Sequence, residues 1–216
     1  MAKINSIDNK SSELTIDPGA SGDSFVQFAI NTTGEFRIGV DDDASDSFKI
    51  SQGSALGSND TFIMSASGER TMPLQPAFLA RPASNETNIT GDGTVATLIF
   101  GTEIFDQNSD FDGTSTFTAP VSGRYLFQTA VFLEDLTSSH TAYELYFSCT
   151  GRDYRLKTTN FAASQFVNSN QFNANGEAVI DMTAGDTCVV KIMVSGSSKV
   201  VDTSAGVMHF SGHLIC

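Results

Sequence analysis

The stretch Phe117-Thr-Ala-Pro120-Val-Ser-Gly123-Arg-Tyr125-Leu-Phe127 places aromatic residues, a proline and a glycine at fixed offsets. Proline fixes φ and lacks an N–H donor, so strand pairing should stop at Pro120, and Gly123 should relieve the turn that follows. Tyr125 and Phe127 then point to one face, because side chains alternate along a strand. The stretch predicts a β-arch whose aromatic residues belong to a hydrophobic core.

The composition agrees with a β-rich fold. The 216 residues include 17 Phe and 18 Gly but no Trp. Together with many Ser, Thr and Asn residues, this composition favours short strands joined by tight turns. We therefore predict an all-β chain whose C-terminal part is a jelly roll of about ten strands in two sheets. The predicted strands of this part begin at Phe78 and then cover 96–100, 123–133, 142–149, 154–158, 170–172, 177–182, 187–194 and 207–215.

Two later landmarks accompany the opening stretch. Gly185-Asp186 begins a later strand, and Phe210-Ser-Gly212-His-Leu214-Ile215 closes the chain. In this order and spacing, the three landmarks resemble the globular head of the complement component 1 q-subcomponent and tumour necrosis factor superfamily, from about Pro76 to Cys216. The sequence departs from that pattern in a compressed run at 105–111 and at Thr129, where a further aromatic residue is usual.

The resemblance implies a tight threefold trimer held together by apolar faces around its axis. The aromatic residues available for the axis or for the core of each chain are Phe117, Tyr125, Phe127, Tyr146 and Phe210. The sequence leaves open which of them face the axis.

Three regions are expected along the chain: a polar arm at 1–20, a short β-rich segment at 21–72 and the jelly-roll head at 73–216. The arm has too few apolar residues to bury much surface alone, so we expect it to be an attachment arm that becomes ordered on a partner. The proline-rich stretch 72–82 contains the expected boundary between the β-rich segment and the head.

The β-rich segment carries apolar residues at alternate positions in Phe36-Arg-Ile38-Gly-Val40 and Phe48-Lys-Ile50. This pattern predicts one buried face and exposes Arg37 and Lys49 on the other. A sheet this small is marginal in water, so its apolar face is expected to pack against other copies and make the segment trimerise. The segment resembles β-rich segments of bacteriophage tail-fibre and structural proteins.

Charge and hydropathy exclude several classes of protein. The formal net charge of −13 disfavours binding to nucleic acid and to anionic membranes. No apolar run approaches the roughly 20 residues that a membrane-spanning helix needs, and the N-terminus lacks the apolar region of a secretory signal. Cys149 and Cys188 lie in apolar strand runs and are expected to be buried thiols, whereas the terminal Cys216 could be exposed.

Several acidic and histidine residues are candidates for metal or catalytic sites. Asp41-Asp42-Asp43-Ala-Ser-Asp46 lacks the ligand spacing of a calcium loop and is expected to be a solvated turn. His209 and His213 are four residues apart, which on a strand is about 13 Å and too far for one zinc ion. His140 has no catalytic partner that the sequence identifies, so we predict no enzymatic activity and no cofactor.

Asp106, Asp110 and Asp112 form a second acidic group, in a loop that can lie near the end of the trimer in the resembling superfamily. Some members of that superfamily bind calcium there. A cation bridging three chains is therefore a hypothesis for these residues, although no binding motif is matched.

The function expected from these observations is that of a bacteriophage virion protein: a trimeric tail or head fibre whose C-terminal knob binds a host-surface glycan or protein. The candidate contact loops are 85–92, 136–141 and 160–168, because they are polar and carry no core pattern. Two alternatives stay open, namely a capsid decoration protein without a receptor role and a secreted adhesion or pattern-recognition protein.

Overall fold

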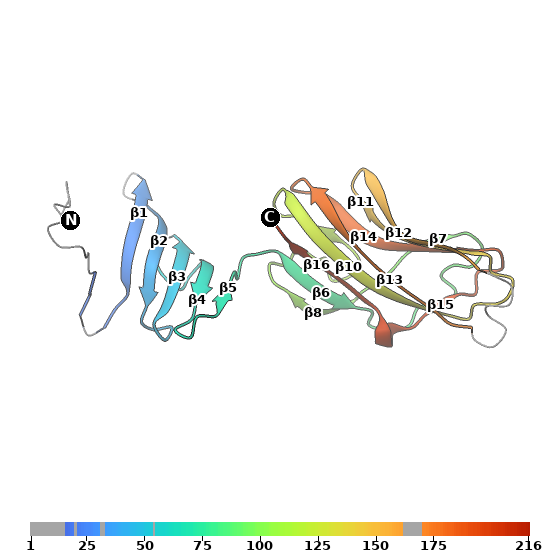
Figure 1. The fold of residues 1–216 in the computed structure, drawn as a ribbon, viewed down its shortest axis with the longest axis horizontal. Helices are drawn as coiled ribbons and strands as arrows, with labels where there is room; N and C mark the ends of the chain where they lie inside the picture. Colours follow the sequence, from blue (N-terminus) through green and yellow to red (C-terminus); the bar gives the residue numbers. More distant parts are fainter. Residues whose placement is uncertain (1–15, 20, 31–32, 54, 162–169) are drawn as a thin grey trace. The chain divides into compact units, whose positions relative to one another are not determined.

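The computed structural model describes residues 16–19, 21–30, 33–53, 55–161 and 170–216. The chain divides into two compact units, Met1–Leu74 and Gln75–Cys216. In the described ranges the regular structure is strands plus one short 3-10 helix, Ala205–Val207, which confirms the all-β prediction (Figure 1). None of these ranges contains a helix long and apolar enough to cross a membrane.

The N-terminal unit is a single antiparallel sheet of five strands in sequential order. They are β1 (Ser24–Ile30), β2 (Thr33–Asp41), β3 (Ser47–Gln52), β4 (Asp60–Met64) and β5 (Arg70–Thr71). The register aligns Val26, Ile38, Ile50 and Phe62 in one row across four strands. Because side chains alternate along each strand, one face of the sheet is apolar.

This apolar face has no second layer over it among the described residues of the unit. Phe28 and Phe36 sit opposite each other in the register and are 58% and 45% exposed. A sheet normally buries one face against another layer, so the uncovered face is a feature that the unit alone does not explain.

The opposite face of the same sheet corrects the expectation for Lys49. We expected its side chain to be exposed, but Lys49 is buried, and its ammonium contacts Asp41 at 2.8 Å and Asp60 at 3.0 Å. Gly57 lies over this group and donates its N–H to Asp60 at 3.0 Å. The turn at Asp41 is accordingly not wholly solvated, because Asp41 is buried whereas Asp42, Asp43 and Asp46 are exposed.

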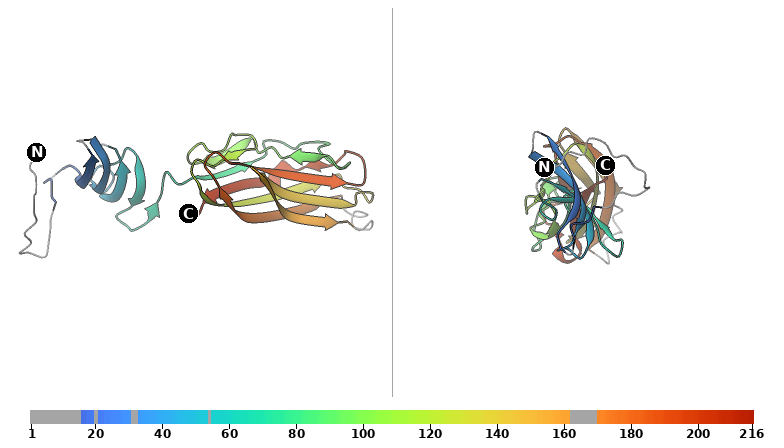
Figure 2. Two further views of the ribbon diagram at one scale, coloured as in Figure 1. Left: turned by 90° about the horizontal axis from the view of Figure 1, so that it is seen from above. Right: turned by 90° about the vertical axis from the view of Figure 1, so that its left-hand side faces the viewer.

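The C-terminal unit packs two antiparallel sheets face to face, as the two views of Figure 2 show. One sheet has the order β13-β10-β16-β6-β8 with β15 beside β10, and the other has the order β12-β11-β14-β7 with β9 beside β14. The strands are β6 (Ala77–Arg81), β7 (Val95–Thr97), β8 (Thr102–Asp106), β9 (Phe117–Thr118), β10 (Gly123–Glu134), β11 (Ala142–Cys149), β12 (Arg152–Asn160), β13 (Phe172–Met182), β14 (Thr187–Ser195), β15 (Asp202–Thr203) and β16 (His209–Leu214).

The opening stretch of the sequence forms the crossing between these two sheets. Phe117 pairs with Cys188 in the smaller sheet, whereas β10 belongs to the larger one, so the chain changes sheets over Ala119–Ser122. The hydroxyl of Tyr125 donates to the carbonyl of Val121 at 2.7 Å and closes this arch.

Gly123 has a different role from the one we expected. It is the first residue of β10 and does not have a positive φ, so it does not relieve a turn. A Cβ at this position would lie 2.7 Å from Leu214 Cδ1 and 2.8 Å from the carbonyl oxygen of Cys216. Glycine is needed here because the C-terminal segment passes close to the strand.

Several strand predictions change in the structure: the strand expected at 96–100 is Val95–Thr97, and β15 was not predicted. Residues 170–172 and 177–182 were expected as two strands, but Phe172–Met182 is one strand, because Gly176 within it lets Leu156 approach instead of making a turn. The compressed run at 105–111 begins within a strand that we did not predict, Thr102–Asp106, which pairs with β6. The last strand begins at His209 rather than at 207, after the 3-10 helix.

Candidate functional site

The structure places four of the five aromatic candidates inside a single chain. Phe117, Tyr125, Phe127 and Phe210 are fully buried between the two sheets. The ring centroids of Phe117 and Phe127 are 5.3 Å apart and those of Phe127 and Phe210 are 5.8 Å apart, the spacing of packed aromatic pairs. These four residues form the intrachain core and are not available to a threefold axis.

Tyr146 lies elsewhere. It is opposite Lys191 and Arg155 in the smaller sheet and does not belong to the core cluster. Burial and the nearby carboxylates of Asp153 and Glu144 raise the pKa of its hydroxyl, despite the opposing charge of Arg155. Tyr146 is therefore part of a polar cluster on the outward side of the smaller sheet.

The outward side of the larger sheet is apolar over β6, β8 and β16. Phe105 and Ser211 lie on either side of Leu79 in the register, and Phe105 is 49% exposed. These strands and Val207, which is 55% exposed, line a hollow of about 650 Å³. Exposed apolar side chains around a hollow are typical of a surface that binds a partner.

His209 and His213 both line this hollow from β16. The backbone carbonyl of His209 accepts a hydrogen bond from Thr129 Oγ1 at 2.8 Å. The polar residue at position 129, where an aromatic residue was expected, thus ties β10 to β16. Partial burial lowers the pKa of His209, which favours its neutral form at the surface of the hollow.

The end of the head where β10 and β14 end is built from loops. The 85–94 loop, which contains the candidate contact loop 85–92, is firmly anchored there. Thr90 is buried and its hydroxyl donates to the carbonyl of Thr94 at 2.6 Å, while the amide of Val194 donates to Thr90 Oγ1 at 2.9 Å. Asn88 N donates to Asp202 Oδ1 at 2.7 Å. Gly91 has a φ of +134°, and an added Cβ would meet the carbonyl oxygen of Ser198 at 2.1 Å. The loop therefore has a defined conformation before any ligand arrives.

The 136–141 loop is less uniformly polar and exposed than the sequence indicated. Leu136 and His140 are both buried. Thr137 N donates to His140 Nδ1 at 2.9 Å, and His140 N donates to the Thr137 carbonyl at 3.0 Å, so the histidine closes the loop. Of the third candidate loop, residues 162–168 lie outside the described residues, and Phe161 is buried.

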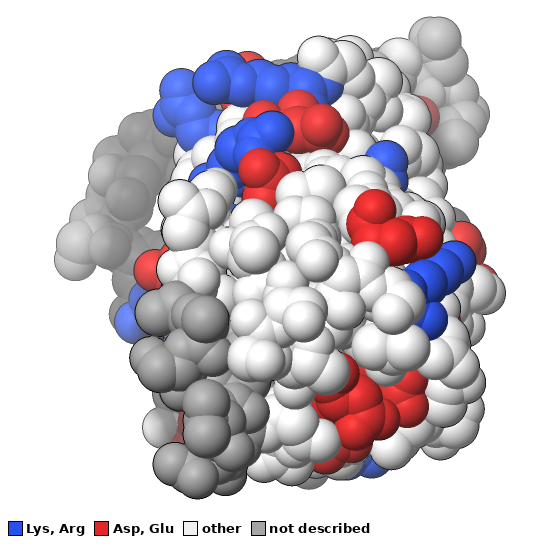
Figure 3. Space-filling model, turned by 90° about the vertical axis from the view of Figure 1, so that its right-hand side faces the viewer, with Lys and Arg blue, Asp and Glu red and all other residues white. Residues whose placement is uncertain are grey.

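The exposed side chains of these loops are mainly hydroxyl and amide groups. Figure 3 looks onto this end of the head and shows an uncharged area between charged groups nearer its margins. The exposed polar residues in these two loops are Asn85, Thr87, Asn88, Asp92, Thr94, Thr137, Ser138, Ser139 and Thr141, and of these only Asp92 is charged. The hydroxyl and amide groups can donate and accept hydrogen bonds without requiring a charged ligand.

The acidic group of the head does not form a common site within one chain. Asp106 accepts hydrogen bonds from the amides of Asp110 and Phe111, and Asp112 Oδ1 accepts three from residues 114–116. Asp110 Oδ2 is buried without a hydrogen-bond partner among the described residues, and burial, with the charge of Asp106, raises the pKa of Asp110. Two of the three carboxylates thus serve to close turns.

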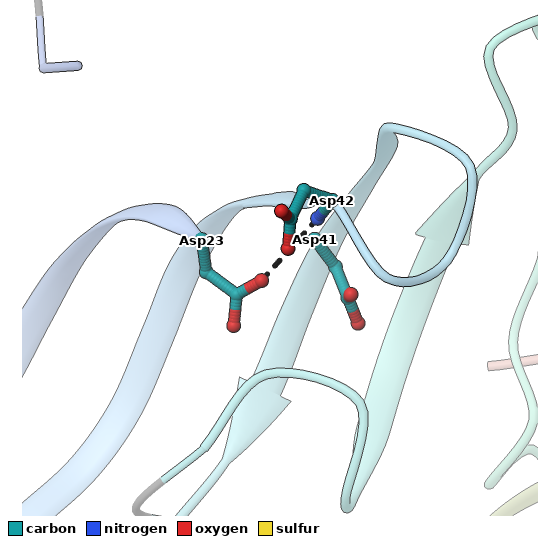
Figure 4. A group of neighbouring side chains, drawn as sticks. All are labelled: Asp23, Asp41 and Asp42. Carbon is teal, nitrogen blue, oxygen red and sulfur yellow. Dashed lines mark hydrogen bonds between the residues drawn. The ribbon is translucent and has the colours of Figure 1, made fainter. Parts of the chain in front are cut away.

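Among the described residues, three carboxylates come within 4.8 Å of one another only at Asp23, Asp41 and Asp42 (Figure 4). Each already has a partner in the protein. Asp42 N donates to Asp23 Oδ1 at 3.3 Å, Gly22 N donates to Asp42 Oδ2 at 2.7 Å, and Asp41 pairs with Lys49. The group joins the start of β1 to the end of β2.

Comparison with known proteins assigns the head. A sequence model of the C1q domain matches residues 77–215. The chain belongs to the C1q-domain family. The predicted superfamily is thereby confirmed for the head.

Two solved structures illustrate the similarity. The globular domain of the zebrafish complement 1qA protein is 21% identical, with a TM-score of 0.46, and the alignment covers 66% of this chain and 98% of that one. Murine APRIL at pH 8.0 is 14% identical, with a TM-score of 0.45 and coverage of 65% and 99%. The search of curated proteins finds no match.

Sequence reasoning did not find the hollow on the larger sheet. Its residues come from β6, β8 and β16, and β8 was not predicted as a strand. The alternation of Ala77, Leu79 and Arg81 against the buried Phe78 and Ala80 would have identified the outward side chains of β6. The sequence could not show that this side is left apolar by its neighbours.

Proposed function

We propose that this chain is the subunit of a homotrimeric bacteriophage appendage, a tail or head fibre that carries a C1q-type knob for host-surface recognition. The observation that carries the proposal is the single sheet that precedes the head in the sequence, with its uncovered apolar face. In a fibre, the apolar faces of parallel copies of this sheet would cover one another. We propose no enzymatic role, because the clustered aromatic side chains of the head form a packed core rather than a group of catalytic side chains.

The head trimer, in this proposal, forms through the outward side of β6, β8 and β16. The exposed side chains of Phe105 and Val207 would become buried in this interface, while the aromatic core remains within each chain. A stable interface needs an apolar centre with a polar rim, and the hollow lined by Leu79 and Phe105 supplies the apolar centre.

The N-terminal sheets would associate in the same assembly. The row containing Ile38, Ile50 and Phe62 supplies apolar area on each copy, and three copies joined through their heads hold these faces at high effective concentration. The segment before them, 1–15, lies outside the described residues, and its role as an arm that docks on another virion protein is part of the proposal.

The recognition surface would be the loop end of the head, on a polar, uncharged ligand such as a surface glycan. The anchored conformation of the 85–94 loop supports this assignment, because a preformed loop loses little entropy on binding. Three copies per appendage would raise the avidity of a weak single site.

Two measurements on virions and host cells test this function. A cryo-EM map of the purified virus should show density for the trimer on a tail or head fibre, and fluorescently labelled protein should bind host cells. Substituting Thr87→Ala, Asn88→Ala and Ser138→Ala together should abolish cell binding while the trimer persists. Virion density without cell binding would instead identify a decoration protein, and absence of the chain from virions would favour the secreted alternative.

A further inference from the structure

We propose that Cys149 and Cys188 form a redox site, at which an oxidant of the low-molecular-weight disulfide class closes an intrachain disulfide between β11 and β14. This inference is independent of the proposed viral role. It concerns the end of the sandwich where β11 ends and β14 begins.

The strand register brings the two cysteines face to face. Cys149, the last residue of β11, lies directly opposite Cys188, the second residue of β14. Their sulfur atoms are 2.7 Å apart. Directly opposite residues in antiparallel strands have Cβ atoms about 4.5–5.5 Å apart, and a disulfide spans about 3.5–4.5 Å. Bond formation therefore requires only a small approach of the two strands.

The surrounding contacts hold this geometry in place. Beyond the pair, Thr150 N donates to the carbonyl of Thr187 at 3.0 Å, and Thr187 N donates to Thr150 Oγ1 at 2.8 Å. On its other side, Cys188 lies opposite Phe117 of β9. The two sulfurs are thus positioned by strand pairing on both sides, and no segment needs to refold for them to react.

The two thiols differ in accessibility, which sets the order of reaction. Cys188 is fully buried, whereas Cys149 is only partly buried at the strand end. Burial raises the pKa of the Cys188 thiol, and the contact with Cys149 raises it further, so Cys188 remains protonated. Cys149 is therefore the sulfur that meets an external oxidant first.

The chemistry is a pair of thiol–disulfide exchanges. The Cys149 thiolate attacks one sulfur of the external disulfide, forms a mixed disulfide and releases one thiolate, which takes up a proton. The Cys188 sulfur then loses its proton, attacks Cys149 Sγ and expels the second thiolate. The two protein thiols are oxidised by two electrons in total, and one external disulfide is reduced to two thiols.

The test uses the full chain carrying Cys216→Ser, which removes the exposed third thiol. The reduced protein is incubated in its folded state with oxidised glutathione, then denatured in acid and alkylated with N-ethylmaleimide. We expect unlabelled protein, lighter than the reduced protein by two hydrogen atoms, and a linked peptide pair containing Cys149 and Cys188. Two maleimide labels per chain, a persistent glutathione adduct or a link between chains would overturn the proposal.

A matched variant and a stability measurement complete the test. Cys149→Ser with Cys216→Ser should keep one maleimide label on Cys188 and give no linked peptide. In the Cys216→Ser protein, oxidation should raise the thermal midpoint, because the crosslink closes a loop between residues 39 apart in sequence, and dithiothreitol should reverse the rise. A midpoint that is unchanged or lower after oxidation would overturn the stabilising role of the disulfide.

Discussion

Lys49 shows how a single residue controls the N-terminal sheet. Its ammonium is shielded from water and held between Asp41 and Asp60, whose own side chains are almost completely buried. Removing one member of a buried ion group leaves the others uncompensated, which is costly even where the intact group adds little net stability. The polar face of this sheet is therefore specified by charge, and its apolar face remains available for association.

Replacing this lysine provides a direct measure of that control. Lys49→Met should lower the free energy of unfolding of the N-terminal unit by about 3–5 kcal/mol, because Asp41 and Asp60 then remain buried with like charge. Calorimetry of the full chain should show one transition shifted to lower temperature. Arg70→Met removes a charge at an exposed position of the same unit and should shift it little. Equal shifts in the two variants would contradict the account.

The same group predicts a pH dependence. Burial alone would raise the pKa of Asp60, but hydrogen bonds from Ser51, Lys49 and Gly57 outweigh it and leave the pKa below its ordinary 3.8. Burial alone would lower the pKa of Lys49, but its two carboxylate partners outweigh it and leave the pKa above 10.5. The contribution of Asp60 is thus complete above pH 3.8 and lost as the pH falls through its folded value, whereas that of Lys49 is lost as the pH rises above 10.5.

Calorimetry between pH 3 and 11 should therefore show the N-terminal transition weakening at both extremes. Lys49→Met should remove the alkaline loss, because no ammonium then remains to titrate in the group. An alkaline loss of the same size in Lys49→Met would assign it to another residue.

Gly176 is a second position at which one atom decides the structure. A Cβ there would lie 2.6 Å from Leu156 Cβ, which cannot move without its backbone. Gly176→Ala should destabilise the head by about 1–3 kcal/mol through overpacking. At Gly101 an added Cβ would make an ordinary 3.7 Å contact with Ala83, so Gly101→Ala serves as the control and should leave the thermal midpoint nearly unchanged.

At the scale of elements, the outward side of β6, β8 and β16 is the surface through which we propose that the head trimerises. Phe105→Glu should shift the head from trimer to monomer, because a carboxylate would be buried at the apolar centre of the interface. Sedimentation velocity measures the shift. Val95→Glu is a matched control, since Val95 is also 49% exposed but lies on β7 of the other sheet. A trimer that survives Phe105→Glu, or dissociates equally in both variants, would place the interface elsewhere.

The elements also show what the sequence could and could not predict. Strong alternation fixed β10, β11 and β14 closely, and the aromatic arch between β9 and β10 was recognisable from Phe117 to Phe127. Two strands, 170–172 and 177–182, were predicted where β13 is continuous, because the sequence does not show that Leu156 approaches Gly176 within a strand. Alternation placed Lys49 on the solvent side of its strand. The sequence does not show that Asp41 and Asp60 meet it there in the fold.

The candidate surfaces, too, could be predicted only in part. Polar loops were identified from composition, yet His140 and Leu136 proved to be buried, since a polar loop can close on its own side chains. The hollow on the larger sheet depends on which strands become neighbours. That information is nonlocal, and the alternation within one strand does not contain it.

At the scale of the whole molecule, both units have an apolar surface that a partner could cover. The single sheet has an apolar face that nothing described in its own unit covers, and the head has an apolar hollow on its outward side. Association of three copies would cover both. Each copy carries a formal charge of −13, so the assembly should be measured at physiological salt, where exposed charges are screened beyond about 8 Å.

The measurement that tests this account most directly is sedimentation equilibrium of the full-length chain at micromolar concentration and physiological salt. The account predicts a single species of three times the 23.0 kDa chain mass. A species of one chain mass under these conditions would contradict it.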